Sequence, residues 1–121
     1  MTLNEYQEAA MKTCLPSSQN LSYMLLGLNE EVGELSGKVA KLIRKGKVFF
    51  SSEGDVRPLM FPGEKEEAME AIAKELGDVA WMLAGCCKVL GFSLEDICQK
   101  NIDKLADRAK RGVIDSQGDN R

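Results

Sequence analysis

Two long stretches of this chain repeat apolar residues at alternating intervals of three and four. The first contains Leu21, Leu25, Leu28, Val32, Leu35, Val39 and Leu42, and the second contains Met69, Ile72, Leu76, Val79, Leu83, Cys86 or Cys87, and Leu90. Because an α-helix has 3.6 residues per turn, this spacing puts each set on one side of a helix. The predicted helices run from Leu21 to about Lys45 and from Lys65 to Leu90. Two such helices pack their apolar sides together, so the sequence predicts an all-α bundle.

Shorter helices are predicted on both sides of this pair. One runs from Asn4 to about Cys14, before a Pro-Ser-Ser break. The other begins after Ser93, which is placed like an N-cap, and continues to about Arg111 before a glycine. The sequence therefore predicts three to four helices in a single domain, residues 1–121, that ends in a polar tail over residues 113–121.

The segment from Gly46 to Gly63 interrupts the helical pattern. It contains two of the three prolines and a turn-like stretch between the apolar runs Val48-Phe49-Phe50 and Pro58-Leu59-Met60-Phe61. This irregular insert between the two long helices is compatible with a small β-hairpin from about Val48 to Phe61.

The residue types that the chain lacks exclude several kinds of site. There is no histidine, which excludes Ser-His-Asp and Cys-His triads, H-E-x-x-H zinc sites and Glu-x-x-His di-iron bundles. The four cysteines include no C-x-x-C pair and are expected to be reduced thiols. Acid–base or metal chemistry must therefore come from carboxylates, lysines, tyrosines or bound water.

Charge and hydropathy restrict the partners. The 121 residues carry a net charge of -3, and a nucleic-acid-binding domain would be expected to present a basic face instead. No stretch approaches the roughly 20 apolar residues of a membrane span, and the N-terminus does not resemble a signal peptide. We expect a cytoplasmic protein with no nucleic-acid or membrane partner.

Each long helix carries two carboxylates three residues apart, at the edge of its apolar stripe. The pairs are Glu31 with Glu34 and Glu75 with Asp78. Residues three apart project from the same helical face, so pairing the helices along their stripes brings four carboxylates together. Taken singly, such a pair is most often a solvated, salt-bridged face. Two pairs on consecutive helices favour a metal site.

An all-oxygen site of this kind suits Mg²⁺, with Mn²⁺ as a substitute. Because Mg²⁺ shares its coordination shell with phosphates, the chemistry indicated is attack of water on a phosphoryl group with a carboxylate as base. The last helix presents Asn101, Lys104 and Arg108 on one face, and these donors suit a phosphate chain. A solvated face is the commoner meaning of such a stripe.

These residues resemble the signature of the MazG-like all-α nucleoside triphosphate pyrophosphohydrolases, in their small stand-alone, phage-type branch. The signature E-E-x-x-E followed by E-x-x-D reads Glu30-Glu31-Val32-Gly33-Glu34 and Glu75-Leu76-Gly77-Asp78 here, with a longer spacer than usual. The resemblance extends over nearly the whole chain. It implies Mg²⁺-dependent cleavage of an NTP or dNTP between the α and β phosphates, and a homodimer or a dimer of dimers.

The resemblance also implies roles for individual residues. Metal ligands would be Glu31, Glu34, Glu75 and Asp78. Glu30 would hold or activate the water, a role that it and Glu31 can exchange. The phosphates would be bound by Asn101, Lys104 and Arg108. Trp81 is a candidate for stacking on the base, although a place in the core or at an interface is the commoner role of such a residue.

Two alternatives stay open from the sequence. One is a non-catalytic helical dimerisation or interaction module that has kept the bundle and lost the reaction. The other is an enzyme with a narrow preference for dUTP or dCTP.

Overall fold

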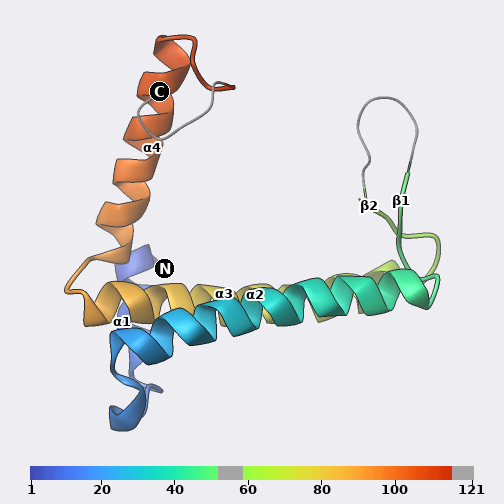
Figure 1. Cartoon of the computed structure of the whole chain (residues 1–121), viewed down its shortest axis with the longest axis horizontal. Helices are drawn as coiled ribbons and strands as arrows, with labels where there is room; N and C mark the ends of the chain where they lie inside the picture. Colours follow the sequence, from blue (N-terminus) through green and yellow to red (C-terminus); the bar gives the residue numbers. More distant parts are fainter. Residues whose placement is uncertain (52–58, 116–121) are drawn as a thin grey trace.

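The computed structural model describes residues 1–51 and 59–115. Its elements are α1 (Leu3–Met11), a 3-10 turn (Pro16–Ser18), α2 (Leu21–Arg44), β1 (Phe49–Phe50), β2 (Leu59–Met60), α3 (Lys65–Val89) and α4 (Leu94–Lys110) (Figure 1). The prediction of an all-α fold with a small hairpin between the two long helices is confirmed. Residues 52–58 of the insert and 116–121 of the polar tail lie outside the described residues.

The helices begin and end at local signals in the sequence. The side chains of Thr2, Asn20 and Ser93 each accept a hydrogen bond from a backbone N–H in the first turn of α1, α2 and α4. The ends of α2, α3 and α4 are followed by Gly46, Gly91 and Gly112, with φ values of 69°, 73° and 69°. These positive angles strain any residue that has a Cβ, so glycine ends each of the three helices.

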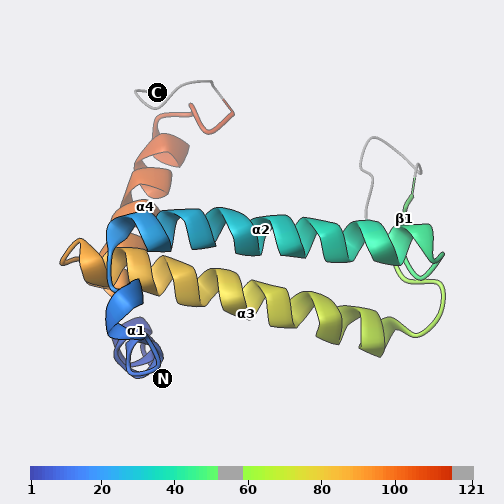
Figure 2. The ribbon, with the colours of Figure 1, turned by 60° about the horizontal axis from the view of Figure 1, so that its bottom comes forward.

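Helices α2 and α3 lie side by side and antiparallel along the whole long axis, and α1 crosses them near one end (Figure 2). In their contact, two glycines face two methionines. A Cβ on Gly27 would overlap the Met82 side chain, and a Cβ on Gly85 would overlap the Met24 side chain. Met24 is completely buried as a result. Small residues therefore set how closely the two helices approach.

The buried sides of these helices coincide only in part with the predicted stripes: Leu42 is buried and Leu28 and Ile72 pack against the core, but other stripe residues do not. Leu25, Val32, Leu76 and Leu83 belong to the stripes but are 41–51% exposed. The α2–α3 contact uses a neighbouring face that includes Met24, Gly27, Met82 and Gly85. The physical reason is that a close contact between helices needs small residues, which a search for large apolar side chains passes over.

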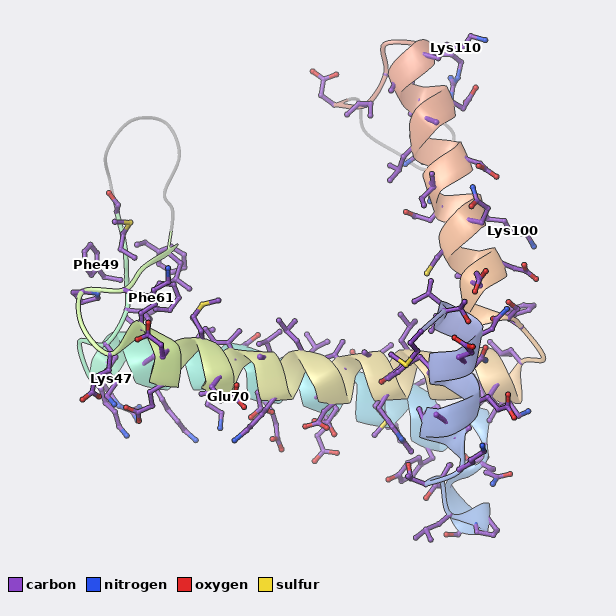
Figure 3. The ribbon with its side chains drawn as sticks, turned by 180° about the vertical axis from the view of Figure 1, so that it is seen from behind. Lys47, Phe49, Phe61, Glu70, Lys100 and Lys110 are labelled. Atoms are coloured by element: carbon purple, nitrogen blue, oxygen red, sulfur yellow. The ribbon has the colours of Figure 1, made fainter. Side chains whose placement is uncertain are left out.

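The core consists of small separate clusters. At the α1 end, Cys14, Met24, Met82 and Cys86 pack together. At the hairpin end, Leu42, Val48 and Ala68 pack together, with Phe61 against them. Figure 3 shows Phe49 and Phe61 at the base of the hairpin. Between these two ends, the middle of the α2–α3 pair carries the acidic residues Glu31, Glu34 and Glu75.

Helix α4 turns away from the long pair, and its axis makes an angle of 101° with that of α3. It and the hairpin project from the same side of the pair at opposite ends (Figure 1). Beyond its first turns, Ile102 and Leu105 are 59% and 43% exposed. Among the described residues no single helix is long and apolar enough to span a membrane, and only the bent α3–α4 pair meets that criterion jointly.

The base of α4 is held by the buried side chain of Gln7. Its amide donates to the carbonyl of Phe92 at 3.0 Å and to that of Ala84 at 3.5 Å. Its oxygen accepts from the backbone N–H of Leu94 at 2.9 Å. That N–H belongs to the first turn of α4, where no partner exists within the helix. The side chain of Gln7 on α1 therefore accepts a hydrogen bond from a backbone N–H at the N-terminus of α4.

We expect Gln7→Leu to lower the free energy of unfolding by about 1–3 kcal/mol, because it leaves the buried Leu94 N–H without an acceptor. Urea denaturation measures this loss. The control is Gln99→Leu, which removes an exposed hydrogen bond to Asp103 within α4. Equal losses in the two variants would contradict the assignment.

Candidate active site

Three carboxylates from two helices meet in the middle of the α2–α3 pair. Glu31 and Glu34 lie one turn apart on α2, and Glu75 lies on α3. One oxygen from each lies within 4.8 Å of the others. The antiparallel pairing of two long helices places these groups together, although Glu75 is more than forty positions from the other two in the sequence.

The donor set suits a hard divalent cation. All three groups offer only carboxylate oxygens, and Glu75 is 8% exposed. Oxygens on opposite sides of a Mg²⁺ ion are about 4 Å apart. Side-chain rotations that shorten separations of up to 4.8 Å would let the three groups bind such an ion. Three negative charges this close also need a neutralising partner.

The neutralising partner in this structure is Lys38. Its Nζ lies 3.0 Å from Oε1 of Glu75, joining α2 to α3. The side chain of Glu75 is 10% exposed and that of Lys38 is 39% exposed. The lysine therefore lies at the border between the acidic cluster and solvent.

Burial raises the pKa of Glu31 above its ordinary value, and the negative charges of Asp78, Glu34, Glu30 and Glu75 raise it further. A carboxyl whose pKa is raised by folding stabilises the folded state below its unfolded pKa. This contribution is lost as the pH rises through the folded pKa. The ionised form of Glu31 is thus unfavourable for folding at neutral pH unless a cation is bound.

We expect Glu31→Gln to raise the melting temperature by a few degrees at pH 8 in EDTA, because it removes this crowded charge. The gain should shrink as the pH falls towards 4.5, the ordinary pKa of the group. Circular dichroism at both pH values measures it, with exposed Glu8→Gln on α1 as the control. A higher melting temperature for the wild type than for Glu31→Gln at pH 8 would contradict the expected direction of the effect.

Asp78 lies one turn after Glu75 on α3, outside the group of three closest carboxylates. It is exposed, yet its charge raises the pKa of both Glu31 and Tyr6. Burial is the larger cause of the raised pKa of Tyr6. The structure therefore places Asp78 beside the cluster, together with a tyrosine of α1. The role of Asp78 as a metal ligand stays a prediction.

Glu30 and Trp81 are two further predicted site residues on the long helices α2 and α3. Glu30 is exposed on α2. The half-buried indole of Trp81 donates its N–H to the carbonyl of Ala10 at 3.1 Å and to Oγ1 of Thr13 at 2.9 Å. These bonds join α3 to α1 and orient the ring. The water-activating role of Glu30 and the base-stacking role of Trp81 stay predictions.

The three predicted phosphate-binding residues lie on the outer part of α4. Asn101 and Lys104 are exposed, whereas Arg108 is only 5% exposed. Because α4 leaves the α2–α3 pair (Figure 1), one chain does not bring these residues next to the acidic cluster. Their proposed role therefore depends on a second chain or on a movement of α4.

Two residues near the site were not predicted from the sequence. Lys38 follows Glu34 by four positions and Glu31 by seven, so helical spacing puts it on the same face, and this signal was available. Tyr6 belongs to α1, and only the crossing of α1 over α3 brings it near Asp78. No local pattern indicates such a contact.

The chain is similar to known proteins over most of its length. The model of the MazG nucleotide pyrophosphohydrolase domain matches residues 19–113. The Gene 37 protein of Mycobacterium phage L5 is 34% identical over 128 aligned residues that cover all of both chains. The crystal structure of iMazG from Vibrio DAT 722 is similar with a TM-score of 0.53 and 24% identity, over 91% of this chain and 97% of that one.

The name of the Gene 37 protein describes no activity. The likeness to iMazG supports the fold. The family match is the decisive finding. It covers both long helices, the acidic cluster between them and all of α4. Together with the resemblance of the two acidic motifs, it shows that the chain belongs to the MazG nucleotide pyrophosphohydrolase family.

Proposed function

We propose that this protein is a divalent-metal-dependent pyrophosphohydrolase that cleaves nucleoside triphosphates between the α and β phosphates. The observation that carries the proposal is the meeting of Glu31, Glu34 and Glu75 within 4.8 Å, in a chain of this family. The products are a nucleoside monophosphate and pyrophosphate. We propose Mg²⁺ as the cation, with Mn²⁺ as a substitute, and the cytoplasm as the place of action.

The residues divide the work as follows. Glu31, Glu34 and Glu75 hold the cation together with Asp78, which lies one turn after Glu75 on α3. A bound divalent cation supplies polarisation of the α-phosphate and lowers the pKa of a coordinated water. Glu30 or Glu31 accepts the proton of the attacking water as a general base.

We further propose that the protein acts as a homodimer or a dimer of dimers. Support comes from the large apolar side chains that α2 and α3 leave exposed, among them Leu26 at 73% and Leu76 at 51%. Exposed apolar surface of this extent marks an interaction site. A second copy on this face would cover it and would offer a further α4, with Asn101, Lys104 and Arg108, to the acidic cluster. Light scattering coupled to size exclusion measures the assembly.

The function is tested by incubating purified protein and Mg²⁺ with each of the eight common NTPs and dNTPs. Chromatography scores monophosphate and diphosphate products separately. We expect monophosphate and pyrophosphate, and we expect their formation to stop on addition of EDTA. Activity with dUTP or dCTP alone would indicate the narrow enzyme. A folded protein without turnover in Mg²⁺ or Mn²⁺ would favour the non-catalytic interaction module.

A further inference from the structure

A cleft lined by lysines lies directly beside the acidic cluster. It has a volume of about 220 Å³ and lies between the C-terminal half of α2 and the N-terminal half of α3. Its lining residues are Lys38, Lys41, Leu42, Lys45, Lys47, Glu67 and Ala71. Four of these seven residues are lysines and one is an acid, so the cleft is cationic in a protein of net negative charge.

Lys38 belongs to both the cleft and the acidic cluster. It lines the cleft and its Nζ lies 3.0 Å from Glu75. The anionic centre and the cationic cleft are therefore continuous, and one side chain forms the boundary. A ligand that spans them would carry a cation at one end and exposed negative charge at the other.

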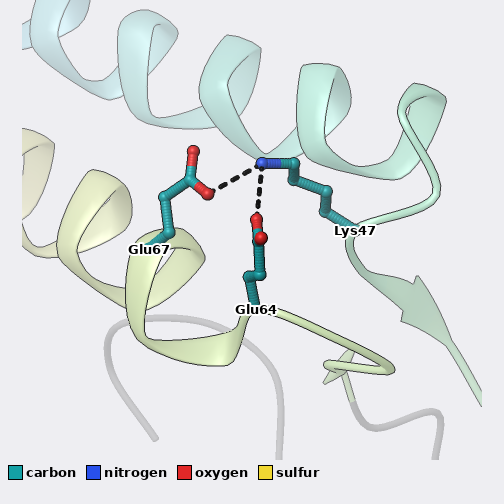
Figure 4. A network of polar contacts seen from close by, with 3 residues as sticks. All are labelled: Lys47, Glu64 and Glu67. Atoms are coloured by element: carbon teal, nitrogen blue, oxygen red, sulfur yellow. Dashed lines mark hydrogen bonds and ion pairs between the residues drawn. The ribbon is translucent and has the colours of Figure 1, made fainter.

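The lysines of the cleft differ in how their charge is balanced. At the outer end, Lys47 binds Glu67 at 2.9 Å and Glu64 at 3.4 Å (Figure 4). At the inner end, Lys38 binds Glu75. Between them, no carboxylate of residues 1–51 and 59–115 lies within 4.0 Å of Lys41 or Lys45. The middle of the cleft thus presents two ammonium groups that form no ion pair with a described carboxylate, although the charge of Lys45 still contributes to lowering the pKa of Glu67.

We propose that this lysine cleft binds the β- and γ-phosphates of the substrate, and hence the pyrophosphate leaving group. The inference rests on the proposed function and deepens it. Lys41 on α2 and Lys45 at its C-cap follow Lys38 at successive turns, so a phosphate chain that starts at Glu75 continues past both. When a cation binds Glu75, it replaces the ammonium group of Lys38. The Lys38 side chain then rotates towards the phosphates.

In the reaction, the oxygen of water bonds to the α-phosphorus while the bond from that phosphorus to the bridging oxygen breaks. The bridging oxygen keeps the electron pair and leaves with pyrophosphate, and a carboxylate takes the proton of the water. Negative charge therefore grows on the leaving group. Fixed ammonium groups beside that oxygen stabilise the transition state more than the ground state.

The binding test uses inorganic pyrophosphate and Mg²⁺ in isothermal titration calorimetry. We expect the double variant Lys41→Gln, Lys45→Gln to bind pyrophosphate at least about tenfold more weakly than wild type, and to bind a nucleoside monophosphate equally well. The matched control is Lys100→Gln with Lys110→Gln, the same charge change on α4, away from the cleft (Figure 3). Equal pyrophosphate affinity in the two double variants would overturn the inference.

The test of Lys38 uses Mn²⁺ alone, followed by electron paramagnetic resonance. Because Lys38 competes with the cation for Glu75, we expect Lys38→Gln to bind Mn²⁺ more tightly than wild type while kcat falls, and Lys38→Arg to restore part of kcat. Weaker Mn²⁺ binding by Lys38→Gln would instead mean that Lys38 stabilises the metal-binding arrangement of the acidic cluster. That result would contradict the proposal that Lys38 leaves Glu75 when a cation binds.

The inference and the proposed function fail in different ways. Pyrophosphate binding that depends on Lys41 and Lys45, in a protein that cleaves no nucleotide, supports the cleft and counts against the enzyme. Cleavage of nucleotides with pyrophosphate binding unchanged in the double variant supports the enzyme and overturns the cleft.

Discussion

Turnover of nucleoside triphosphates is expected to fall by at least about 100-fold in both Glu34→Gln and Glu75→Gln. Groups that merely support a metal ligand typically cost about 10–100-fold when mutated, so loss of a charged ligand costs more. Glutamine keeps the size of the side chain and removes one negative charge from a crowded cluster. The melting temperature is therefore expected to stay the same or to rise. Initial rates at saturating Mg²⁺ and thermal unfolding measure the two effects.

The matched control is Glu70→Gln, which lies five positions before Glu75 on the same helix and is exposed (Figure 3). Among residues 1–51 and 59–115 it is ion-paired with Lys74 alone, one turn along at 3.9 Å, so its replacement should leave the rate within about twofold of wild type. Full activity in Glu34→Gln and Glu75→Gln would remove the acidic cluster from the mechanism. Unfolding of both variants would show that the cluster is structural.

The second large effect is expected in the contact between the long helices. Met24→Ala should lower the free energy of unfolding by about 2–5 kcal/mol, because Met24 is completely buried against Gly85 and its removal leaves a cavity. That is a large share of the roughly 5–15 kcal/mol that stabilises a typical domain. Urea denaturation at two protein concentrations measures the loss and separates it from any effect on assembly.

Met69→Ala provides the same chemical change at an exposed position. Met69 lies on α3 and is 46% exposed, so its truncation should cost under about 1 kcal/mol. A similar cost at both positions would mean that Met24 is not the closest point of the helix pair. The comparison also tests whether small residues, rather than the aliphatic stripes, determine the packing.

Most helix boundaries follow from local chemistry, which a sequence displays directly. Ser93 begins α4 and glycines end three helices because caps and positive φ angles act over a few neighbouring residues. The buried face of each helix is less predictable. Apolar spacing shows which residues avoid water, including those that face another chain, and it gives no weight to Gly27 or Gly85.

The proximity of Glu31, Glu34 and Glu75 is predictable because i, i+3 spacing and helix pairing together determine it. Their roles as ligands stay a prediction. The ion pair of Lys38 is harder to foresee, since its spacing from Glu34 suggests a contact within α2, whereas the structure pairs it with Glu75 on α3. The direction of α4 depends on Gln7 and a short turn, which no periodicity encodes.

The hydrogen bonds of Trp81 have a spectroscopic consequence. Trp81 is the single tryptophan of the chain. Its indole N–H donates to the carbonyl of Ala10, within α1, and to Oγ1 of Thr13, just after α1. Its emission therefore reports on the attachment of α1, whereas far-ultraviolet ellipticity is dominated by α2 and α3, the two longest helices. Detachment of α1 and unfolding of the long pair are in this way two optically distinct events in a single unlabelled protein.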